Sequence, residues 1–448
     1  MTAPLVGRLF GADYATQAFS DPVRLQSMLD FEAALARAEV EVGLIPAAAA
    51  KAIGAQCRAE LFDIDQLADA ANRAGKPAIP MVKALTALVG RTDTDASRYV
   101  HWGATSQDAI DTGLVLQLRQ FLSAFAADLD HLAAALATLA SKHKATPLAG
   151  RTWLQHAVPV TLGLKAAGWL DAIERHRARL ADVRSRAIVL QLGGAAGTLA
   201  AFDGLGLEVA TILARELDLP LPATSWHAER DRIAEIGTVL GLIVGTLGKI
   251  GRDLSLLMQT DVGEAFEPNG EGRGGSSTMP HKRNPVAAAV ILAAAVRAPG
   301  LVATLLAAMV QEHERGLGGW HAEWETLPQL AELAAGALRH TVDAVADLEV
   351  DAARMRANLE TTQGQIFAEA VAMALAPKIG RAEAHALVER ACRRATEAKR
   401  HLKAVLAADP AATAHLSPAD LDRLFEPLNY VGEAEALVDR VLGARRRT

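Results

Sequence analysis

The feature of this sequence that most limits its fold is the length of the segments almost free of proline and glycine. Between Asp108 and Thr146 the only such residue is Gly113. An unbroken helix over this segment would extend about 55 Å. Apolar residues recur in it at steps of three and four, which is the period of a helix with a buried face. They are Leu114, Leu118, Leu122, Phe125, Leu129, Leu132, Leu136 and Leu139.

Four further segments have a similar helical character. Five long helices, with little strand-like sequence, predict an all-α fold built on a central bundle of five long helices. Many of these segments are so rich in Ala, Leu and Val that they are apolar on more than one side, which is typical of helices inside a large assembly. We therefore predict that the bundle is shared between subunits. The four segments are 159–190, 226–261, 285–310, which Pro299 and Gly300 interrupt, and 328–358.

Shorter helices flank the long ones. Prolines and glycines break up the first hundred residues, and a further helical region follows Pro377. This pattern predicts three domains: an N-terminal helical domain over 1–105, the central long-helix bundle over 106–360, and a small C-terminal helical domain over 361–448. The segment 188–202 is the best candidate for a short hairpin.

Charge and cysteine content exclude several classes of protein. The 46 basic and 52 acidic residues give a net charge of −6, so there is no overall basic field to attract nucleic acid or an anionic membrane. Cys57 and Cys392 form no CxxC pair, which argues against a disulfide framework or a thiolate zinc site. The longest apolar runs fall short of the roughly 20 residues of a membrane span, and no signal peptide begins the chain. We expect a soluble cytoplasmic protein without nucleic-acid or membrane partners.

One polar loop is the first candidate for a functional segment. Residues 269–285 read NGEGRGGSSTMPHKRNP, so glycines adjoin a pair of serine hydroxyls and the cation pair Lys282 and Arg283. Asn284 and Pro285 are a favourable N-cap and first residue for the next helix, whose unpaired N–H groups would attract an anion. A loop that merely joins a helix would explain these two residues but not Ser277 and Lys282. No GK[ST] follows the glycines, which excludes a phosphate-binding P-loop.

Two other polar segments precede long helices. Residues 98–108 contain His101 and the Thr105–Asp108 spacing of a helix capping box. Residues 150–163 place His156 directly before the position where the next long helix is expected to begin. A lone histidine at such a place is often structural, so His156 has both a structural and a catalytic interpretation.

Two more segments lack the spacing of known cofactor sites. Residues 311–328 follow the fourth long helix; most of their charges should be solvated, and their histidines do not have the HExxH spacing of a zinc site. Gly193, Gly194 and Gly197 do not complete a dinucleotide-binding pattern. We therefore expect chemistry without a metal or a cofactor.

Three of these segments together resemble the signature regions of the fumarase/aspartase superfamily. They are GSSTMPHKRNP at 275–285, GATSQDAIDT at 103–112 and TWLQHAVPVTLG at 152–163, and the resemblance covers almost the whole chain. Members are mostly homotetramers with a central bundle of long helices, and each active site draws three regions from three subunits. The resemblance therefore implies a homotetramer with shared active sites and a small polycarboxylate substrate.

Within the superfamily, the chain is most similar to the family of bacterial 3-carboxy-cis,cis-muconate cycloisomerases, by its residues 29–46, 103–119 and 313–328. Adenylosuccinate lyases are the nearest alternative. The chain lacks their N-terminal Arg-Tyr pair, has KPAIPMVKAL at 76–85 in place of their HDV motif, and has Trp324 in place of a substrate-binding arginine. A 4-sulfomuconate cycloisomerase and a non-catalytic structural relative remain further alternatives.

The resemblance also implies roles for individual residues. Ser277 would handle the proton on the α-carbon, and His156 is the second acid/base candidate; which of them donates the proton stays open. The resemblance implies neither metal nor cofactor. The side chains implied to bind the substrate are Lys282, Asn284, Thr105, Ser106, Thr152, Gln155, His101 and Arg315.

Overall fold

The computed structural model describes residues 4–270, 272, 274–276 and 278–445. Within these ranges helices dominate and the sheets are two short two-stranded ones, which confirms the predicted all-α class. Contacts within the chain separate two compact units. Unit 1 comprises Met1–Leu129, His176–Leu247 and Ala293–Arg339; unit 2 comprises Asp130–Arg175, Gly248–Leu292 and His340–Thr448.

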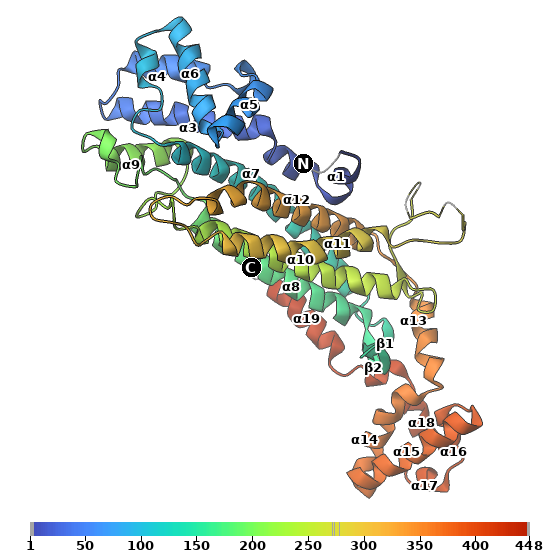
Figure 1. Cartoon of the computed structure of the whole chain (residues 1–448). Coiled ribbons are helices and arrows are strands. Elements are labelled where there is room, and N and C mark those ends of the chain that lie inside the picture. Colours follow the sequence, from blue (N-terminus) through green and yellow to red (C-terminus); the bar gives the residue numbers. More distant parts are fainter. Residues whose placement is uncertain (1–3, 271, 273, 277, 446–448) are drawn as a thin grey trace. The chain divides into compact units, whose positions relative to one another are not determined.

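Five long helices form, as predicted (Figure 1). The expected interruption at Pro299 and the expected start at Pro328 are both wrong, because each proline lies inside a helix. A proline removes one backbone hydrogen bond, and packing of its neighbours can offset that loss; Ala298 and Leu327 are buried. The helices are α7 (Ser106–Lys142), α8 (Leu162–Ala187), α10 (Asp231–Leu257), α11 (Val286–Ala307) and α12 (Gly319–Ala346).

Within unit 1, glycines let α10 and α11 approach closely. A Cβ atom added to Gly237 would lie 2.3 Å from Leu305 Cδ1, and one added to Gly241 would lie 2.6 Å from Val302 Cγ2. Because the interior is close-packed, either side chain would push the two helices apart.

The N-terminal helices of unit 1 enclose a core of their own. Helix α3 (Asp21–Glu41) packs on α4 (Ala47–Gln56) and on α9 (Gly206–Leu217). Figure 1 shows α3 to α6 side by side in blue. The remaining helices of this part are α1 (Pro4–Phe10), α2 (Asp13–Ala18), α5 (Ile64–Ala74) and α6 (Ala78–Thr92).

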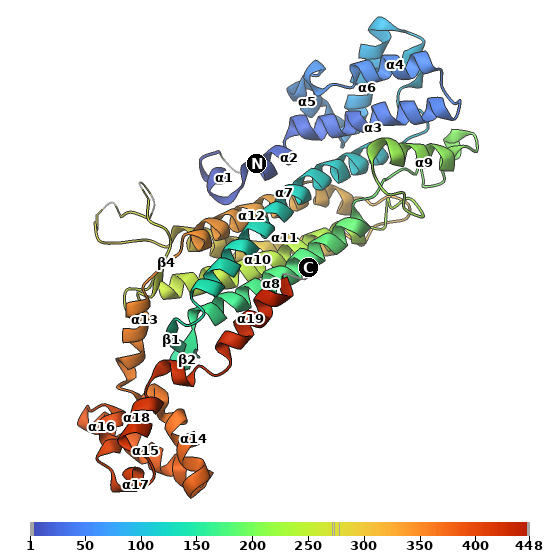
Figure 2. The same cartoon turned by 180° about the vertical axis from the view of Figure 1, so that it is seen from behind.

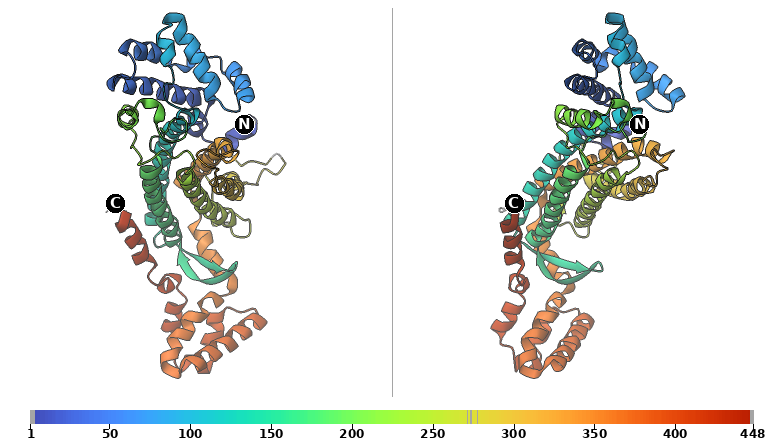
Figure 3. Two further views of the ribbon diagram at one scale, coloured as in Figure 1. Left: turned by 60° about the vertical axis from the view of Figure 1, so that its left-hand side comes forward. Right: turned by 90° about the vertical axis from the view of Figure 1, so that its left-hand side faces the viewer.

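A hairpin forms in unit 2 rather than at 188–202, where it was predicted. Strands β1 (Pro147–Thr152) and β2 (Gln155–Thr161) pair antiparallel around Trp153 and Leu154, which both have positive φ (Figure 3). This two-residue turn suits the twist of the strands. Pro159 is therefore a strand residue, and α8 begins at Leu162. The segment 188–202 is loop with one 3₁₀ turn, because Gly194 and Gly197 adopt positive φ.

The C-terminal helices of unit 2 share an apolar cluster that includes Phe367, Leu387 and Leu402. The last helix lies beside α8 (Figure 2) and its Arg445 forms an ion pair with Glu174. The helices are α13 (Ala352–Leu359), α14 (Ala368–Ile379), α15 (Arg381–Ala398), α16 (Leu402–Ala407), α17 (Pro410–Thr413), α18 (Pro418–Leu424) and α19 (Ala434–Arg445); strands β3 (Ala265–Phe266) and β4 (Glu349–Val350) pair in the same unit.

Three of the long helices, α7, α10 and α11, are long and apolar enough to cross a membrane by length and composition. The expectation that every apolar segment is too short is wrong, because it counted unbroken apolar runs, whereas a membrane span needs only to be predominantly apolar. Such helices are also typical of a large protein core. The first turns of α7 carry buried Gln107, Asp108 and Asp111, whose partners lie within unit 1.

Candidate active site

In unit 1, a buried carboxylate organises the turn that precedes α7. Asp108 accepts hydrogen bonds from the backbone N–H groups of Thr105, Gly193 and Gly194, each at 2.9 Å, and its Oδ1 lies 2.7 Å from His227 Nε2. Of the two hydrogen bonds of the predicted capping box, the one from the Thr105 backbone N–H to the Asp108 side chain is therefore present. Asp108 also links this turn to the loop that contains Gly193 and Gly194. These glycines therefore have a structural role that involves no nucleotide.

Arg315 joins the same turn from the segment before α12. Its Nε donates to Gln107 Oε1 at 3.0 Å, and its Nη2 donates to Thr105 Oγ1 at 3.1 Å and to the Ala195 carbonyl at 3.0 Å. Nowhere in the described ranges does a carboxylate pair with Arg315. The predicted residues Thr105 and Arg315 thus meet, with half-buried Ser106 adjacent, and offer a cation and hydroxyls to an anion.

Lys76 is a second cation in this region that the sequence analysis did not single out. It follows Gly75, whose left-handed conformation ends α5, and it is half-buried. Burial lowers the pKa of Lys76, and the positive charge of Arg315 lowers it further. Mutual repulsion between two cations is what an anionic ligand would relieve. The sequence signal that could have identified Lys76 is its place in 76–85, the segment that stands where adenylosuccinate lyases have the HDV motif.

His101, in the same unit, has a partner of its own. Its Nδ1 lies 2.6 Å from Glu32 Oε1, on α3 of the same unit. Sequence patterns did not pair these residues because they lie 69 positions apart.

A buried ion-pair network supports this part of unit 1. Arg230 Nη1 lies 2.7 Å from Asp111 Oδ2, and its Nη2 lies 2.5 Å from Glu323 Oε2, with all three side chains nearly inaccessible. Trp320 Nε1 also donates to Asp111. The expectation that most charges of 311–328 are solvated therefore fails for Glu323. Burial raises the pKa of Glu323, although the Arg230 guanidinium opposes the shift.

In unit 2, the hairpin presents a second set of predicted residues. Thr152 and Gln155 pair across its tip and are exposed. His156 pairs with Arg151, whose guanidinium binds the buried Glu264 through two hydrogen bonds of 2.9 and 2.6 Å. Burial lowers the pKa of His156 and so does Arg151, while Glu264 opposes them. Both effects favour the neutral imidazole of His156, whose buried Nδ1 has no hydrogen-bond partner among the described residues.

The loop before α11 differs from its prediction. Asn284 does not cap the helix: its Nδ2 donates to the carbonyl of Gly274 at 3.1 Å and its backbone N–H donates to the same oxygen at 2.8 Å. Asn284 therefore closes the base of the loop. Lys282 is exposed, and Ser277 lies outside the described residues.

The start of α11 is not open to an anion, which corrects a second expectation. The Glu267 carboxylate, 3% exposed, accepts hydrogen bonds from the backbone N–H groups of Ala287 at 3.0 Å and Ala288 at 2.8 Å. Arg283, the next residue after Lys282, binds Glu349 and the Glu267 carbonyl. An internal carboxylate complements this helix terminus, so a substrate anion must be held by side chains.

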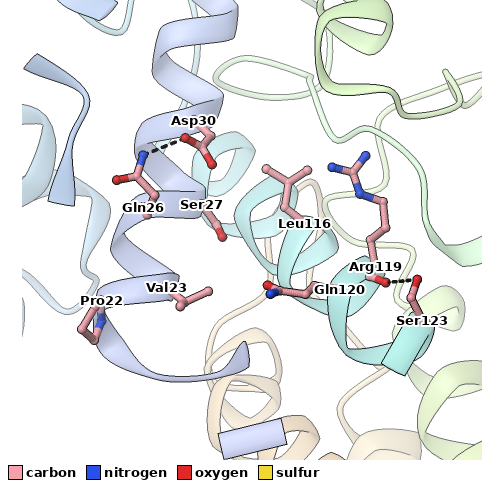
Figure 4. Close-up of a pocket in the computed structure, with 9 residues that line it drawn as sticks. All are labelled: Pro22, Val23, Gln26, Ser27, Asp30, Leu116, Arg119, Gln120 and Ser123. Carbon is pink, nitrogen blue, oxygen red and sulfur yellow. Dashed lines mark hydrogen bonds between the residues drawn. The ribbon is translucent and has the colours of Figure 1, made fainter. Parts of the chain in front are cut away.

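A cavity of about 650 Å³ lies between α3 and α7 of unit 1, and it contains none of the predicted residues (Figure 4). Asp30 on its wall accepts a hydrogen bond from Gln26, and Arg119 donates to the carbonyls of Leu217 and Asp218. Both charges are thus engaged with the protein itself.

Comparison with known proteins places the chain in a family. Residues 9–300 match the family described as Lyase, and residues 364–441 match the family described as Adenylosuccinate lyase C-terminus. The chain belongs to the lyases of the fumarase/aspartase superfamily.

Two relatives and one solved structure are similar to this lyase over nearly its whole length. It is 61% identical over 424 residues to "3-carboxy-cis,cis-muconate cycloisomerase" from Pseudomonas aeruginosa, covering 95% of this chain and 92% of that protein. It is 55% identical over 445 residues to the protein of the same name from Bradyrhizobium diazoefficiens, covering 99% of each. The crystal structure of 3-carboxy-cis,cis-muconate lactonizing enzyme from Pseudomonas putida superposes with a TM-score of 0.95 at 55% identity, covering 99% of each chain.

The lyase therefore distributes its predicted site residues over two separate sets. Unit 1 holds His101, Thr105, Ser106 and Arg315, and unit 2 holds Thr152, Gln155, His156, Lys282 and Asn284. Within the first set, Thr105 and Arg315 are joined directly by a side-chain hydrogen bond.

Proposed function

We propose that this lyase is a cycloisomerase that converts 3-carboxy-cis,cis-muconate to 4-carboxymuconolactone, the lactonising step of protocatechuate degradation in the β-ketoadipate pathway. The observation that carries the proposal is the 61% identity, over nearly the whole chain, to a protein with that name. The unpaired cation Arg315 with the Thr105 hydroxyl supports an anionic substrate.

The reaction is an intramolecular addition and needs no second reactant. One carboxylate oxygen of the muconate forms a bond to an alkene carbon, and negative charge accumulates on the conjugated carboxylate. A proton then reaches the α-carbon, which completes the lactone. Catalysis requires one bound conformer, hydrogen-bond donors at the charged carboxylate, and one proton donor.

The proton donor is Ser277 or His156. A serine hydroxyl is a weak acid, so Ser277 would depend on neighbouring cations such as Lys282. The neutral His156 suits the opposite step, abstraction of a proton, better than donation at neutral pH. This difference favours Ser277 as donor in the lactonising direction, with His156 orienting the substrate.

The active enzyme is a cytoplasmic homotetramer in this proposal, with each site assembled from several subunits. Large apolar side chains are exposed on both units: Val296 of α11 is 81% exposed and Trp153 at the hairpin tip is 98% exposed. Such side chains suit burial against another copy of the chain.

A spectrophotometric assay tests the proposal against its alternatives. Loss of conjugated-diene absorbance with 3-carboxymuconate, without turnover of adenylosuccinate, would support it. Faster turnover of 4-sulfomuconate would reassign the substrate. Cleavage of adenylosuccinate would indicate a C–N lyase, and tight binding of the muconate without turnover would indicate a non-catalytic relative.

A further inference from the structure

Glu32 and His101 form a buried pair that the reaction described above leaves without a role. The imidazole Nδ1 lies 2.6 Å from Glu32 Oε1, and the side chains are 15% and 1% exposed. A contact this short between an imidazole and a carboxylate is a charge-assisted hydrogen bond in which Nδ1 carries the proton. The remaining ring nitrogen, Nε2, has no hydrogen-bond partner among the described residues and is the free end of the pair.

The backbone of His101 has a strained conformation, which the bond to Glu32 helps to stabilise. His101 has a φ of +60°, in the short turn between the 3₁₀ helix Ala96–Tyr99 and α7. A residue with a side chain adopts this conformation at a cost that the surrounding structure must offset. The bond to Glu32 supplies part of that compensation. His101 also lies four positions before Thr105 in the sequence, the residue whose hydroxyl accepts a hydrogen bond from Arg315.

The two carboxylates that act on His101 favour a protonated imidazole. His101 faces Glu32 from α3 and Asp108 from α7, and Glu32 in turn faces Glu39 on α3 and Cys57 at the end of α4. Burial lowers the pKa of His101, but the two carboxylates outweigh it and the net shift is upward. Asp108 is shared with three N–H groups and His227, so Glu32 is the dedicated partner.

We propose that Glu32 is a positioning residue that holds His101 as a cation, with its Nε2–H donated to one carboxylate of the substrate. This inference rests on the proposed function, because it names how unit 1 recognises a polycarboxylate. A cationic donor strengthens as charge accumulates on that carboxylate, so the bond contributes to the transition state as well as to binding. Glu32 itself contacts no substrate and acts through His101.

Glu39 provides a matched control on the same helix. It lies seven residues, or about two turns, from Glu32 and is equally buried at 1% exposed. Burial raises the pKa of Glu39 to about 9, and the negative charge of Glu32 adds to the shift. Glu39 is therefore a neutral acid at pH 7, and Glu39→Gln replaces it with a neutral group of the same shape.

The experiment compares Glu32→Gln and Glu39→Gln in the full-length enzyme. We expect Glu32→Gln to lower kcat/KM for 3-carboxymuconate about 10- to 100-fold, the range for a lost charge-assisted hydrogen bond, and Glu39→Gln to change it less than about threefold. In histidine-labelled protein without substrate, the NMR titration of His101 should move to lower pH in Glu32→Gln only. Equal losses in both variants, or an unmoved His101 titration, would overturn the proposal.

Two further variants separate a positioning role from damage to the fold. If Glu32 acts through His101, adding Glu32→Gln to His101→Gln should cost less than about threefold, whereas additive losses would contradict the proposal. Should Glu32→Gln fail to fold, Glu32→Asp keeps the charge but withdraws the oxygen from Nδ1, and the same two measurements apply. The titration needs no turnover, so it tests the pair even if the enzyme does not accept a muconate.

Discussion

Among single residues, the buried acids of unit 1 differ in the hydrogen-bond donors that surround their carboxyl groups. Asp108 accepts several N–H groups, and Glu323 is bound by Arg230. Both oxygens of Glu39 are buried, and neither has a hydrogen-bond partner in the part of the chain that the structure describes. An unpaired buried carboxylate favours its neutral form, which is why the pKa of Glu39 is raised to about 9.

This raised pKa makes the effect of Glu39→Gln on stability depend on pH. In the unfolded chain Glu39 ionises near 4.5, whereas in the folded protein it stays protonated up to about 9. Between these values the unfolded state binds fewer protons than the folded state, so the free energy of unfolding of the wild type decreases as pH rises. We expect Glu39→Gln to gain in stability relative to wild type from pH 5 to pH 8, measured by urea denaturation. A constant difference across this range would show that Glu39 is ionised in the folded protein.

The two cations Lys76 and Arg315 make a second prediction about single residues. Lys76→Met removes one charge and keeps most of the side-chain length. If both cations attract the substrate anion, KM should rise roughly 10- to 100-fold, the scale of one lost hydrogen bond to a charged group. Lys83→Met on α6, an exposed lysine, is the control and should leave KM unchanged. An unchanged KM in Lys76→Met would place the substrate elsewhere.

At the scale of elements, the start of α11 depends on a carboxylate from outside the helix. Glu267 accepts two of its first N–H groups, and Asn284 closes the preceding loop. Both residues position the segment that carries Lys282. The stability of this helix start and the placement of the candidate loop are therefore linked.

Glu267→Gln tests that link. The amide keeps one acceptor but loses the charge that complements the helix dipole, so we expect a loss of about 1–2 kcal/mol in the free energy of unfolding. Urea denaturation measures this loss, with Glu314→Gln, at an exposed position, as the control. We also expect kcat to fall, because the loop would lose its anchor. Full stability in Glu267→Gln would show that solvent or Asn284 satisfies the helix start.

At the scale of the complete enzyme, each active site of the proposed homotetramer contains residues from several chains, so activity depends on more than one chain. Ser277→Ala and His156→Ala should each lower turnover by about 10²-fold or more, the scale of acid/base catalysis. Mixed tetramers should regain activity if the two residues of one site come from different chains, because some sites then contain neither substitution. The measurement is the muconate assay after verified subunit exchange. Exchange without recovery would assign both residues to one chain.

The helical class and the five long helices follow from the sequence alone, which also singles out the polar segments that hold the candidate site residues. Helix periodicity is a local property, because residues three and four apart share a face wherever the helix lies. Polar segments such as 98–108 and 269–285 stand out for a similar reason, since solvated or functional side chains interrupt apolar periodicity. The pairing of Thr105 with Arg315 did not follow from either pattern.

Tertiary structure alone decided the partners and the exceptions. The hairpin forms at 147–161, two prolines lie inside helices, and Glu267 occupies the helix terminus that was expected to attract an anion. In each case, a group distant in sequence or the packing around it outweighed a local preference. Glu32 and His101 are the clearest example: burial lowers the pKa of the imidazole, but a buried carboxylate 69 residues away helps to raise it. Such effects act through space and burial, which a local pattern in the sequence does not record.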